Sequence, residues 1–291
     1  MKLNFVVPGF SKCGTTTLCS LLNEHPEVFI PKEKEPAFFA YNYTKGWKWY
    51  EESFWSAKPE QMCGEGSTFY TAEEFAEVAC QRMLDAYPDL KFIFLARDPI
   101  KRLESSFREM HHSGYKYDIQ AAYSIGDCLR NLPNMMADTM YWQRLNVYRD
   151  NVPDNRIHTV FLEDLKANPM REIRKCFEFL NINPDAVTSV SNCRLNSASD
   201  KLYDSLLYRR IINGETSRRV WNTLAPLPQR ILTSALRLKR PFRKPVEWDP
   251  RDKRWVLDEV ADDARKFLSW AGKPADFWPS LAVAQDVRDA A

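Results

Sequence analysis

The residues best suited to chemistry lie near the start of the chain, in the loop at residues 8–17 (PGFSKCGTTT). Gly9 and Gly14 allow the backbone to approach a ligand closely, and a helix is expected to begin directly after the second glycine. The first N–H groups of that helix, its dipole and three threonine hydroxyls together form a site for an anion. Because Lys12 adds a positive charge, the segment predicts a phosphate-binding loop.

The spacing of this loop is that of a Walker A motif, in which two glycines separated by four residues precede a lysine. Here Thr15 occupies the lysine position, and Lys12 precedes Gly14 by two residues. The loop is therefore suited to a phosphate but poorly equipped for the β- and γ-phosphates of ATP. A glycine turn before a threonine-capped helix is the alternative that needs no ligand.

A second candidate group follows the apolar run at residues 92–96, where Arg97, Asp98 and Pro99 stand together. An arginine at the end of a strand can offer paired, charge-assisted hydrogen bonds to a phosphate. Ser105, on the helix expected next, can add a hydroxyl. The alternative interpretation is a strand-to-helix turn held by an ion pair.

The elements that must position these residues follow from the pattern of apolar side chains. Short apolar runs predict buried strands at residues 3–7, 92–96 and 158–162, and less clearly at 62–66. Helical spacing predicts helices at residues 15–23, 72–86, 99–111, 137–149 and 169–180. Strands that alternate with helices predict an α/β fold with three layers, a P-loop-like fold with a central parallel sheet flanked by helices.

From about residue 186 the pattern becomes mostly helical. Further helices are predicted at residues 200–213, 227–238 and 251–271, with a proline-rich connector at 240–250. We expect a single domain over residues 1–291. It would comprise a nucleotide-binding α/β core at 1–185 and a mostly helical C-terminal extension at 186–291.

The charge of the chain is unevenly distributed. The formal net charge is only +2, but residues 194–254 hold 15 basic and 6 acidic side chains. A local excess of this size favours an anionic partner, and the solvated faces of basic helices are the alternative. With 44% hydrophobic and 27% charged residues, the composition is that of an ordinary globular chain.

The seven cysteines form no CxxC pair, which argues against a zinc site or a disulfide scaffold. We expect no metal, although a bridge such as Cys176–Cys193 stays open. No run approaches the ~18 apolar residues of a membrane span, and the apolar stretch at the amino terminus is too short for a signal peptide. We therefore expect a cytoplasmic location without stable membrane insertion, and no nucleic-acid partner.

Two of these segments resemble a known family. Residues 12–18 (KCGTTTL) resemble the KxGTTxL loop of sulfotransferases that use 3′-phosphoadenylyl sulfate (PAPS), and residues 92–107 resemble its strand followed by RDPxxRxxSx[YF]. The resemblance implies that the loop binds the 5′-phosphosulfate and that Arg97 and Ser105 bind the 3′-phosphate. The implied loop contacts are Lys12, Cys13, Gly14, Thr15, Thr16 and Thr17.

Residues 31–39 (PKEKEPAFF) resemble the ExxFF segment of heparan-type and bacterial carbohydrate sulfotransferases, in which the glutamate is the general base. By position this is Glu35, with Glu33 as the second choice and a charged surface loop as the alternative. A partly apolar cleft would tune such a carboxylate toward useful basicity. Lys12 would stabilise the charge that develops on the oxygen bridging sulfur to the departing phosphate.

The chain departs from the family pattern at residues 63–70, which look like the segment EK[ST]xx[YF]. Gly66 occupies the usual lysine position, so that lysine's contribution is either missing or supplied elsewhere. Lys34 and the basic stretch at 194–254 are the candidate replacements. The departure also weakens the case for a heparan-like acceptor.

The residues that would contact the acceptor are less sharply marked. Cytosolic sulfotransferases use a histidine base, so His111 and His112 are rivals to Glu35, with a role as helix caps as the alternative. Aromatic side chains could stack on an acceptor, but core packing competes for them. The candidates for substrate binding are Phe39, Trp47, Tyr70 and His111. Lys201 is a further candidate contact to a phosphate.

Together these features predict a single sulfotransferase domain that moves the sulfuryl group of PAPS to a hydroxyl or amine, on a carbohydrate acceptor. The product of the donor would be adenosine 3′,5′-bisphosphate (PAP). One alternative is a P-loop kinase with Asp98 as a magnesium ligand. The other is a sulfotransferase-like binding protein that has lost catalysis through Gly66.

Overall fold

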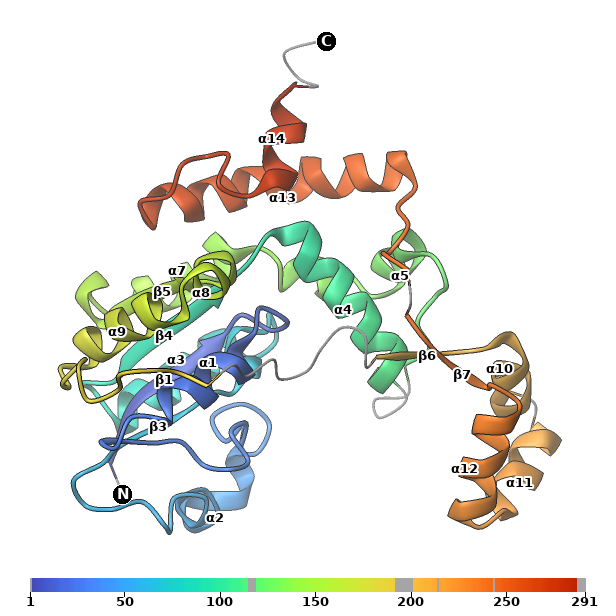
Figure 1. Cartoon of the computed structure of the whole chain (residues 1–291), viewed down its shortest axis with the longest axis horizontal. Coiled ribbons are helices and arrows are strands. Elements are labelled where there is room, and N and C mark those ends of the chain that lie inside the picture. The colour runs from blue at the N-terminus through green and yellow to red at the C-terminus, as the bar shows by residue number, and fades with distance from the viewer. Residues whose placement is uncertain (1, 115–118, 192–200, 214, 243, 287–291) are drawn as a thin grey trace. The chain divides into compact units, whose positions relative to one another are not determined.

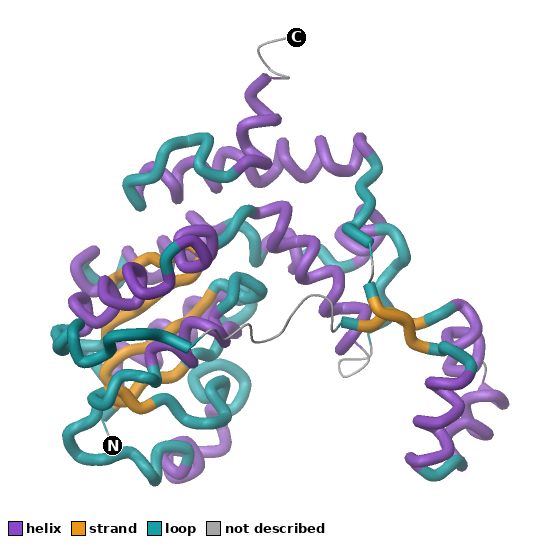
Figure 2. Tube along the Cα trace, in the orientation of Figure 1, coloured by secondary structure: helices purple, strands orange, loops and turns teal. Residues whose placement is uncertain are grey.

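The computed structural model describes residues 2–114, 119–191, 201–213, 215–242 and 244–286 (Figures 1 and 2). The described residues group into two compact units. The first unit draws on residues 1–103, 132–195 and 250–291, and the second on 104–131 and 196–249. The expectation of a single domain stays a prediction.

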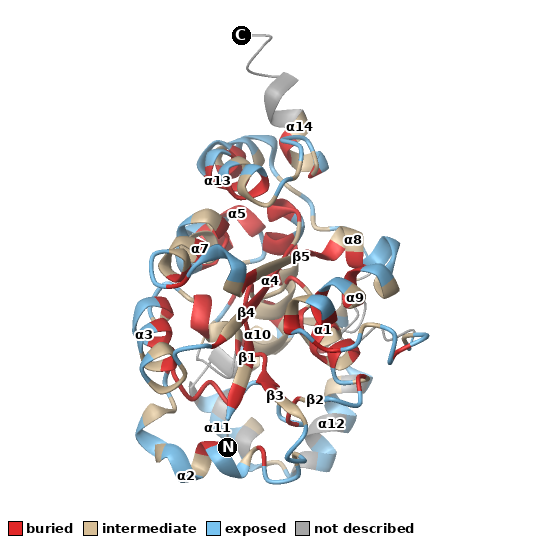
Figure 3. Cartoon of the chain, turned by 90° about the vertical axis from the view of Figure 1, so that its left-hand side faces the viewer, coloured by how far each residue is buried: buried red, intermediate tan, exposed pale blue. Residues whose placement is uncertain are grey.

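A five-stranded parallel sheet forms the centre of the first unit, in the order β2-β3-β1-β4-β5. Its strands are β1 (Leu3–Gly9), β2 (Val28–Phe29), β3 (Met62–Glu65), β4 (Lys91–Ala96) and β5 (Ile157–Phe161). The four predicted strands are confirmed, whereas β2 is too short to produce an apolar run. Strand β1 is buried along most of its length and is the central strand of the sheet (Figure 3). The loop that follows it therefore lies at the middle of the sheet edge.

Helices cover both faces of this sheet, as predicted. Helices α1, α8 and α9 lie on one face, and α3 and α7 on the other (Figure 3). The helices of the first unit are α1 (Thr15–Leu22), α2 (Gly46–Glu52), α3 (Ala76–Ala86), α6 (Asn134–Ala137), α7 (Tyr141–Arg149), α8 (Leu162–Ala167), α9 (Pro169–Leu180), α13 (Pro250–Trp270) and α14 (Pro279–Asp286). At α9 the Asn168 side chain accepts the N–H of Arg171 at 3.0 Å, the N-terminal cap that an asparagine before Pro169 favours.

Helix α4 (Pro99–Ser113) begins in the first unit and continues into the second. The second unit also contains α5 (Ile125–Asn131), α10 (Leu206–Asn213), α11 (Glu215–Thr223), α12 (Pro226–Ala235) and the antiparallel strands β6 (Leu202–Asp204) and β7 (Lys239–Pro241). The helix predicted from residue 200 is therefore wrong at its start. Residues 202–204 pair with the connector at 239–241, a long-range contact that local spacing does not reveal. No described helix combines the length and apolar character needed to cross a membrane.

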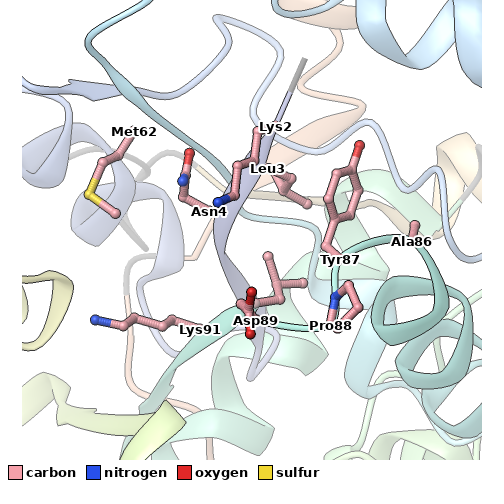
Figure 4. Close-up of a pocket in the computed structure, with 10 residues that line it drawn as sticks. Lys2, Leu3, Asn4, Met62, Ala86, Tyr87, Pro88, Asp89 and Lys91 are labelled. Atoms are coloured by element: carbon pink, nitrogen blue, oxygen red, sulfur yellow. The ribbon is translucent and has the colours of Figure 1, made fainter.

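A pocket of about 280 Å³ lies at the amino ends of the strands, where Leu3, Met62 and Lys91 line it (Figure 4). Ligands of parallel α/β sheets bind at the opposite edge, beyond the carboxyl ends of the strands. The loop after β1 and the residues after β3 and β4 all lie at that carboxyl edge. The carboxyl edge is therefore the expected place of the functional site, and this pocket is not.

Candidate active site

The loop between β1 and α1 has the backbone of a phosphate-binding turn. Gly14 precedes the helix with φ of 102°, a left-handed conformation that favours glycine. A Cβ at this position would also lie 2.9 Å from a methyl carbon of Leu162, so that side chain would have to move. The N–H of Phe10 donates to the carbonyl of Leu95 at 2.9 Å, which fastens the loop to β4. The first N–H groups of α1 have no partner within their helix, which makes them available to an anion.

Two arginines, Arg97 and Arg102, donate hydrogen bonds to carbonyl groups of the loop. The two differ in how many of their donors have partners. Arg102 is buried, and its guanidinium donates to the carbonyl of Ser11 at 3.2 Å and the hydroxyl of Thr139 at 2.9 Å. Arg97 donates to the carbonyl of Lys12 at 3.2 Å, but its Nε is buried without a partner among the described residues. Arg102 therefore supports the loop, whereas Arg97 keeps a donor for a ligand.

Tyr141 links the loop to Arg97 and was not anticipated from the sequence. Its hydroxyl donates to the carbonyl of Arg97 at 2.9 Å and lies 3.4 Å from Sγ of Cys13. Cys13 is fully buried, and burial raises the pKa of its thiol to about 11. Cys13 could therefore contact an anion only through its backbone. No motif marks Tyr141, which is simply the first residue of α7.

The second part of the site joins residues 34 and 35 to the start of α1. Nζ of Lys34 donates to the carboxylate of Glu35, to the carbonyl of Gly66 at 2.8 Å and to the hydroxyl of Thr15 at 3.4 Å. The hydroxyl of Thr68 donates to the other oxygen of Glu35 at 3.5 Å. Glu35 keeps about a third of its side chain exposed, at 37%. The structure therefore brings the predicted base to the phosphate loop with one face open to solvent.

The side chain of Lys34 fills the space beside Gly66. A Cβ built on Gly66 would lie 3.4 Å from Nζ of Lys34 and 2.5 Å from Sγ of Cys19. A side chain at 66 would therefore displace Sγ of Cys19 and would lie in contact with the ammonium group of Lys34. Of the two candidate replacements for the usual lysine, Lys34 is the one whose ammonium group the structure places beside residue 66 and the loop.

A buried carboxylate anchors the segment that carries Glu35. Glu65 ends β3 with no exposed surface, and it accepts hydrogen bonds from Tyr70 at 2.8 Å, Tyr50 at 2.9 Å and Ser67. The hydroxyl of Ser67 in turn accepts the N–H of Ala37 at 2.9 Å. Burial raises the pKa of Glu65 to about 7 in spite of these three donors. The network fixes the chain two residues beyond Glu35.

The raised pKa of Glu65 predicts a pH-dependent contribution to stability. The folded protein binds this proton more tightly than the unfolded chain, so the contribution is fully present below the ordinary pKa of 4.5 and is lost as pH rises through about 7. We expect the free energy of unfolding of the wild type, relative to Glu65→Gln, to fall by about 2 kcal/mol between pH 5 and pH 7. Urea unfolding at several pH values measures this difference. The exposed Glu33→Gln serves as the control, and a Glu65→Gln profile parallel to wild type would contradict the prediction.

The predicted acceptor contacts lie in different surroundings. Phe39 and Tyr70 are fully buried, the latter on Glu65. Trp47 is partly exposed and packs against Phe38, with ring centres 4.9 Å apart. Of these three side chains, that of Trp47 is the one exposed enough to contact an acceptor. All three assignments stay predictions.

The remaining candidates belong to the second unit. His111 is buried, with Nε2 3.0 Å from the carbonyl of Ala122 and Nδ1 3.4 Å from the guanidinium of Arg209. Burial and Arg209 lower its pKa to about 4. The residue is therefore neutral at physiological pH, and both ring nitrogens have protein partners. Ser105 is half-buried on α4.

Two other predicted contacts have partners of their own in this unit. Nδ1 of His112 accepts the N–H of Leu202 at 3.2 Å, and Lys201 pairs with Glu109 at 2.5 Å. Residues 196–200, which precede Lys201, lie outside the described residues. These assignments also stay predictions.

No group of three potential metal ligands occurs within the described ranges. Asp98, the magnesium ligand of the kinase alternative, accepts the N–H of Lys101 at 3.1 Å with one oxygen and that of Ser280 at 3.2 Å with the other. One oxygen therefore holds the first turn of α4, and the other ties that turn to the start of α14. The six described cysteines are buried and free, and Cys193 lies outside the described residues.

Comparison with known proteins agrees with this geometry. Mouse heparan sulfate glucosamine 3-O-sulfotransferase 5 is 26% identical over 190 residues, which cover 62% of this chain and 53% of that protein. The chain thus spans about half the length of that relative. The solved sulfotransferase of Alicyclobacillus acidocaldarius superposes with a TM-score of 0.66 at 19% identity, covering 96% of this chain and 99% of the other.

Mouse sulfotransferase SULT7A1, solved in complex with PAP, has a TM-score of 0.50 at 14% identity and covers 100% of this chain and 89% of its own. At such low identities both structures show a shared fold. The family model of the sulfotransferase domain matches residues 3–208, which include the phosphate loop, the Glu35 segment and Arg97. The chain therefore belongs to the sulfotransferase domain family, an enzyme family that uses PAPS.

Proposed function

We propose that this protein transfers the sulfuryl group of PAPS to a hydroxyl or amine of a carbohydrate acceptor and releases PAP. The observation that carries the proposal is the pairing of Lys34 with Glu35 at the first residue of α1. It joins a candidate base to a phosphate loop that lacks the Walker lysine. The heparan sulfate enzyme among the relatives supports a carbohydrate as the acceptor class.

The residues present fit PAPS. The buried, unpartnered Nε of Arg97 matches a ligand that carries a further phosphate, and the loop after β1 offers backbone N–H groups to the other. Lys12, the threonines at 15–17 and Arg97 would hold the two phosphates. When bound, PAPS would supply an activated sulfuryl group whose leaving group is a phosphate.

The residues of the chain then divide the work. Glu35 accepts the proton that the acceptor hydroxyl or amine loses, while Lys34 and Thr68 hold its two oxygens in place. Lys12 adds positive charge within the loop, where it stabilises the negative charge that develops during transfer. The hydroxyls of Ser67 and Tyr70 accept the N–H groups of Ala37 and Phe39, which holds the Glu35 segment against β3.

A binding measurement and a transfer assay test the proposal against its alternatives. Calorimetry should show PAP binding and weak or no binding of ATP–Mg²⁺, and the reverse result would establish the kinase alternative. Incubation with ³⁵S-labelled PAPS and a panel of glycans should then give labelled product. PAP binding without transfer to any glycan, amine or hydroxyl acceptor would instead favour an inactive binding protein.

Replacement of Lys34 tests whether this lysine supports Glu35. Lys34→Met removes an ammonium that contacts both Glu35 and Thr15, so we expect kcat to fall about tenfold, the equivalent of one charged hydrogen bond. Lys32→Met is the matched control, because Lys32 is exposed on the same segment. PAP affinity should change little in either variant. Equal activities of the two variants would contradict the assignment.

A further inference from the structure

The helices of the second unit expose an unusual amount of apolar surface. Within 30 residues of α10–α12 and the turn after them, six large apolar side chains are between 36% and 67% exposed. They are Leu207, Val220, Leu227, Ile231, Leu232 and Leu236. The rest of the described chain exposes five such side chains over a far longer sequence. Concentrated exposure of this kind marks an interaction surface.

On α12 these side chains form a stripe. Leu227, Ile231 and Ala235 recur every four residues and are all exposed, and Leu232 and Leu236 repeat the spacing beside them. Residues four apart lie above one another on a helix. The apolar face of α12 therefore points to solvent, where an isolated globular unit would bury it.

The same segment is strongly basic. Residues 206–242 contain eight basic side chains and one acidic side chain, Glu215. Arg210, Arg219, Arg237 and Arg240 are exposed. These arginines lie on α10, on α11 and after α12, so the apolar stripe belongs to a basic segment with a single carboxylate. Exposed apolar and basic side chains in one helical segment are typical of helices that lie in the interface of a membrane.

Charge complementarity distinguishes between the possible binding partners of this surface. A second copy of the chain would bring two strongly positive segments together, which repel each other. A nucleic acid would satisfy the arginines through its phosphates but would leave the leucines exposed. An anionic bilayer satisfies both, because its headgroups pair with the arginines and its acyl region accepts the leucines.

We propose that α10–α12 dock the protein onto the surface of an anionic lipid bilayer, with α12 lying in the plane of the membrane. This attachment is peripheral and does not depend on the chemistry at Glu35. It gives the basic segment a partner other than the nucleotide. The proposed catalytic mechanism assigns no role to the residues of this surface.

Vesicle co-sedimentation of the full chain tests this inference. The protein should bind vesicles of phosphatidylcholine mixed with phosphatidylserine at least tenfold more tightly than phosphatidylcholine alone, and added salt should weaken the binding. The double variant Leu227→Glu/Ile231→Glu should lose at least tenfold in vesicle affinity. So should Arg237→Glu/Arg240→Glu. Trp55→Glu, which changes the most exposed tryptophan of the first unit, is the matched control and should bind as wild type.

Circular dichroism and PAP binding should be unchanged in all of these variants, which separates lost docking from lost folding. Absence of vesicle binding at low salt would overturn the proposal. Equal binding to neutral and anionic vesicles would also overturn it. Sedimentation that shows a dimer abolished by Leu227→Glu/Ile231→Glu would assign the surface to a second copy instead.

Discussion

Glu35→Gln is expected to lower kcat by a factor of about 10²–10⁴, the range that general acid–base catalysis contributes. Glutamine keeps the size of the side chain and can still accept from Thr68, but it cannot take the proton of the acceptor. PAP affinity should be nearly unchanged, because Glu35 contacts the loop only through Lys34. Initial rates of labelled sulfate transfer, with PAP calorimetry on the same preparation, measure both quantities.

Glu33→Gln is the matched control for this variant. Glu33 is exposed on the same segment, whereas Glu35 is paired with Lys34 and Thr68. We therefore expect Glu33→Gln to retain wild-type kcat. Loss of activity in Glu33→Gln with full activity in Glu35→Gln would transfer the base to Glu33. Full activity in both would leave His111 and His112 as the bases to test.

The sequence was sufficient to predict the parts of the site that are local along the chain. The strand, glycine loop and helix at residues 3–22 are a continuous segment, so their pattern is visible without long-range information. The same holds for Arg97, which follows β4 directly. The parallel sheet followed from the alternation of strands and helices and is confirmed.

The contacts that complete the site join distant residues and could not be predicted in this way. Lys34 and Gly66 are 32 residues apart, and only the folded chain shows that one fills the space beside the other. Tyr141 donates a hydrogen bond to Arg97, which lies 44 residues earlier in the chain, and no sequence motif predicts this contact. Spacing along the sequence records which side chains share a face, but not which elements meet.

The buried network around Glu65 shows why the departure at Gly66 need not remove activity. Glu65 and Ser67, the flanking family positions, are retained and hold the Glu35 segment against β3. The small residue between them leaves the room that Lys34 occupies. Positive charge is thereby kept beside the loop although its position in the sequence has changed. This argues against the inactive binding protein.

Arg97→Ala is expected to weaken PAP by roughly 1.5–3 kcal/mol, or about 10- to 150-fold, the cost of a lost charged hydrogen bond. The loss should fall on the 3′-phosphate. Adenosine 5′-phosphosulfate lacks that group, so its affinity should change much less. Calorimetry with both ligands against wild type and variant gives the two ratios. Equal losses for both ligands would contradict the assignment of Arg97 to the 3′-phosphate.

Arg102→Ala is the informative contrast, because both arginines contact the loop but only Arg97 keeps a buried donor without a partner among the described residues. The donors of Arg102 serve Ser11, Thr139 and Met135, so the substitution breaks three hydrogen bonds of a buried side chain. We therefore expect Arg102→Ala to lower the free energy of unfolding and to weaken both ligands alike. Arg97→Ala should instead discriminate between them, and this difference separates a residue that binds the nucleotide from one that shapes the loop.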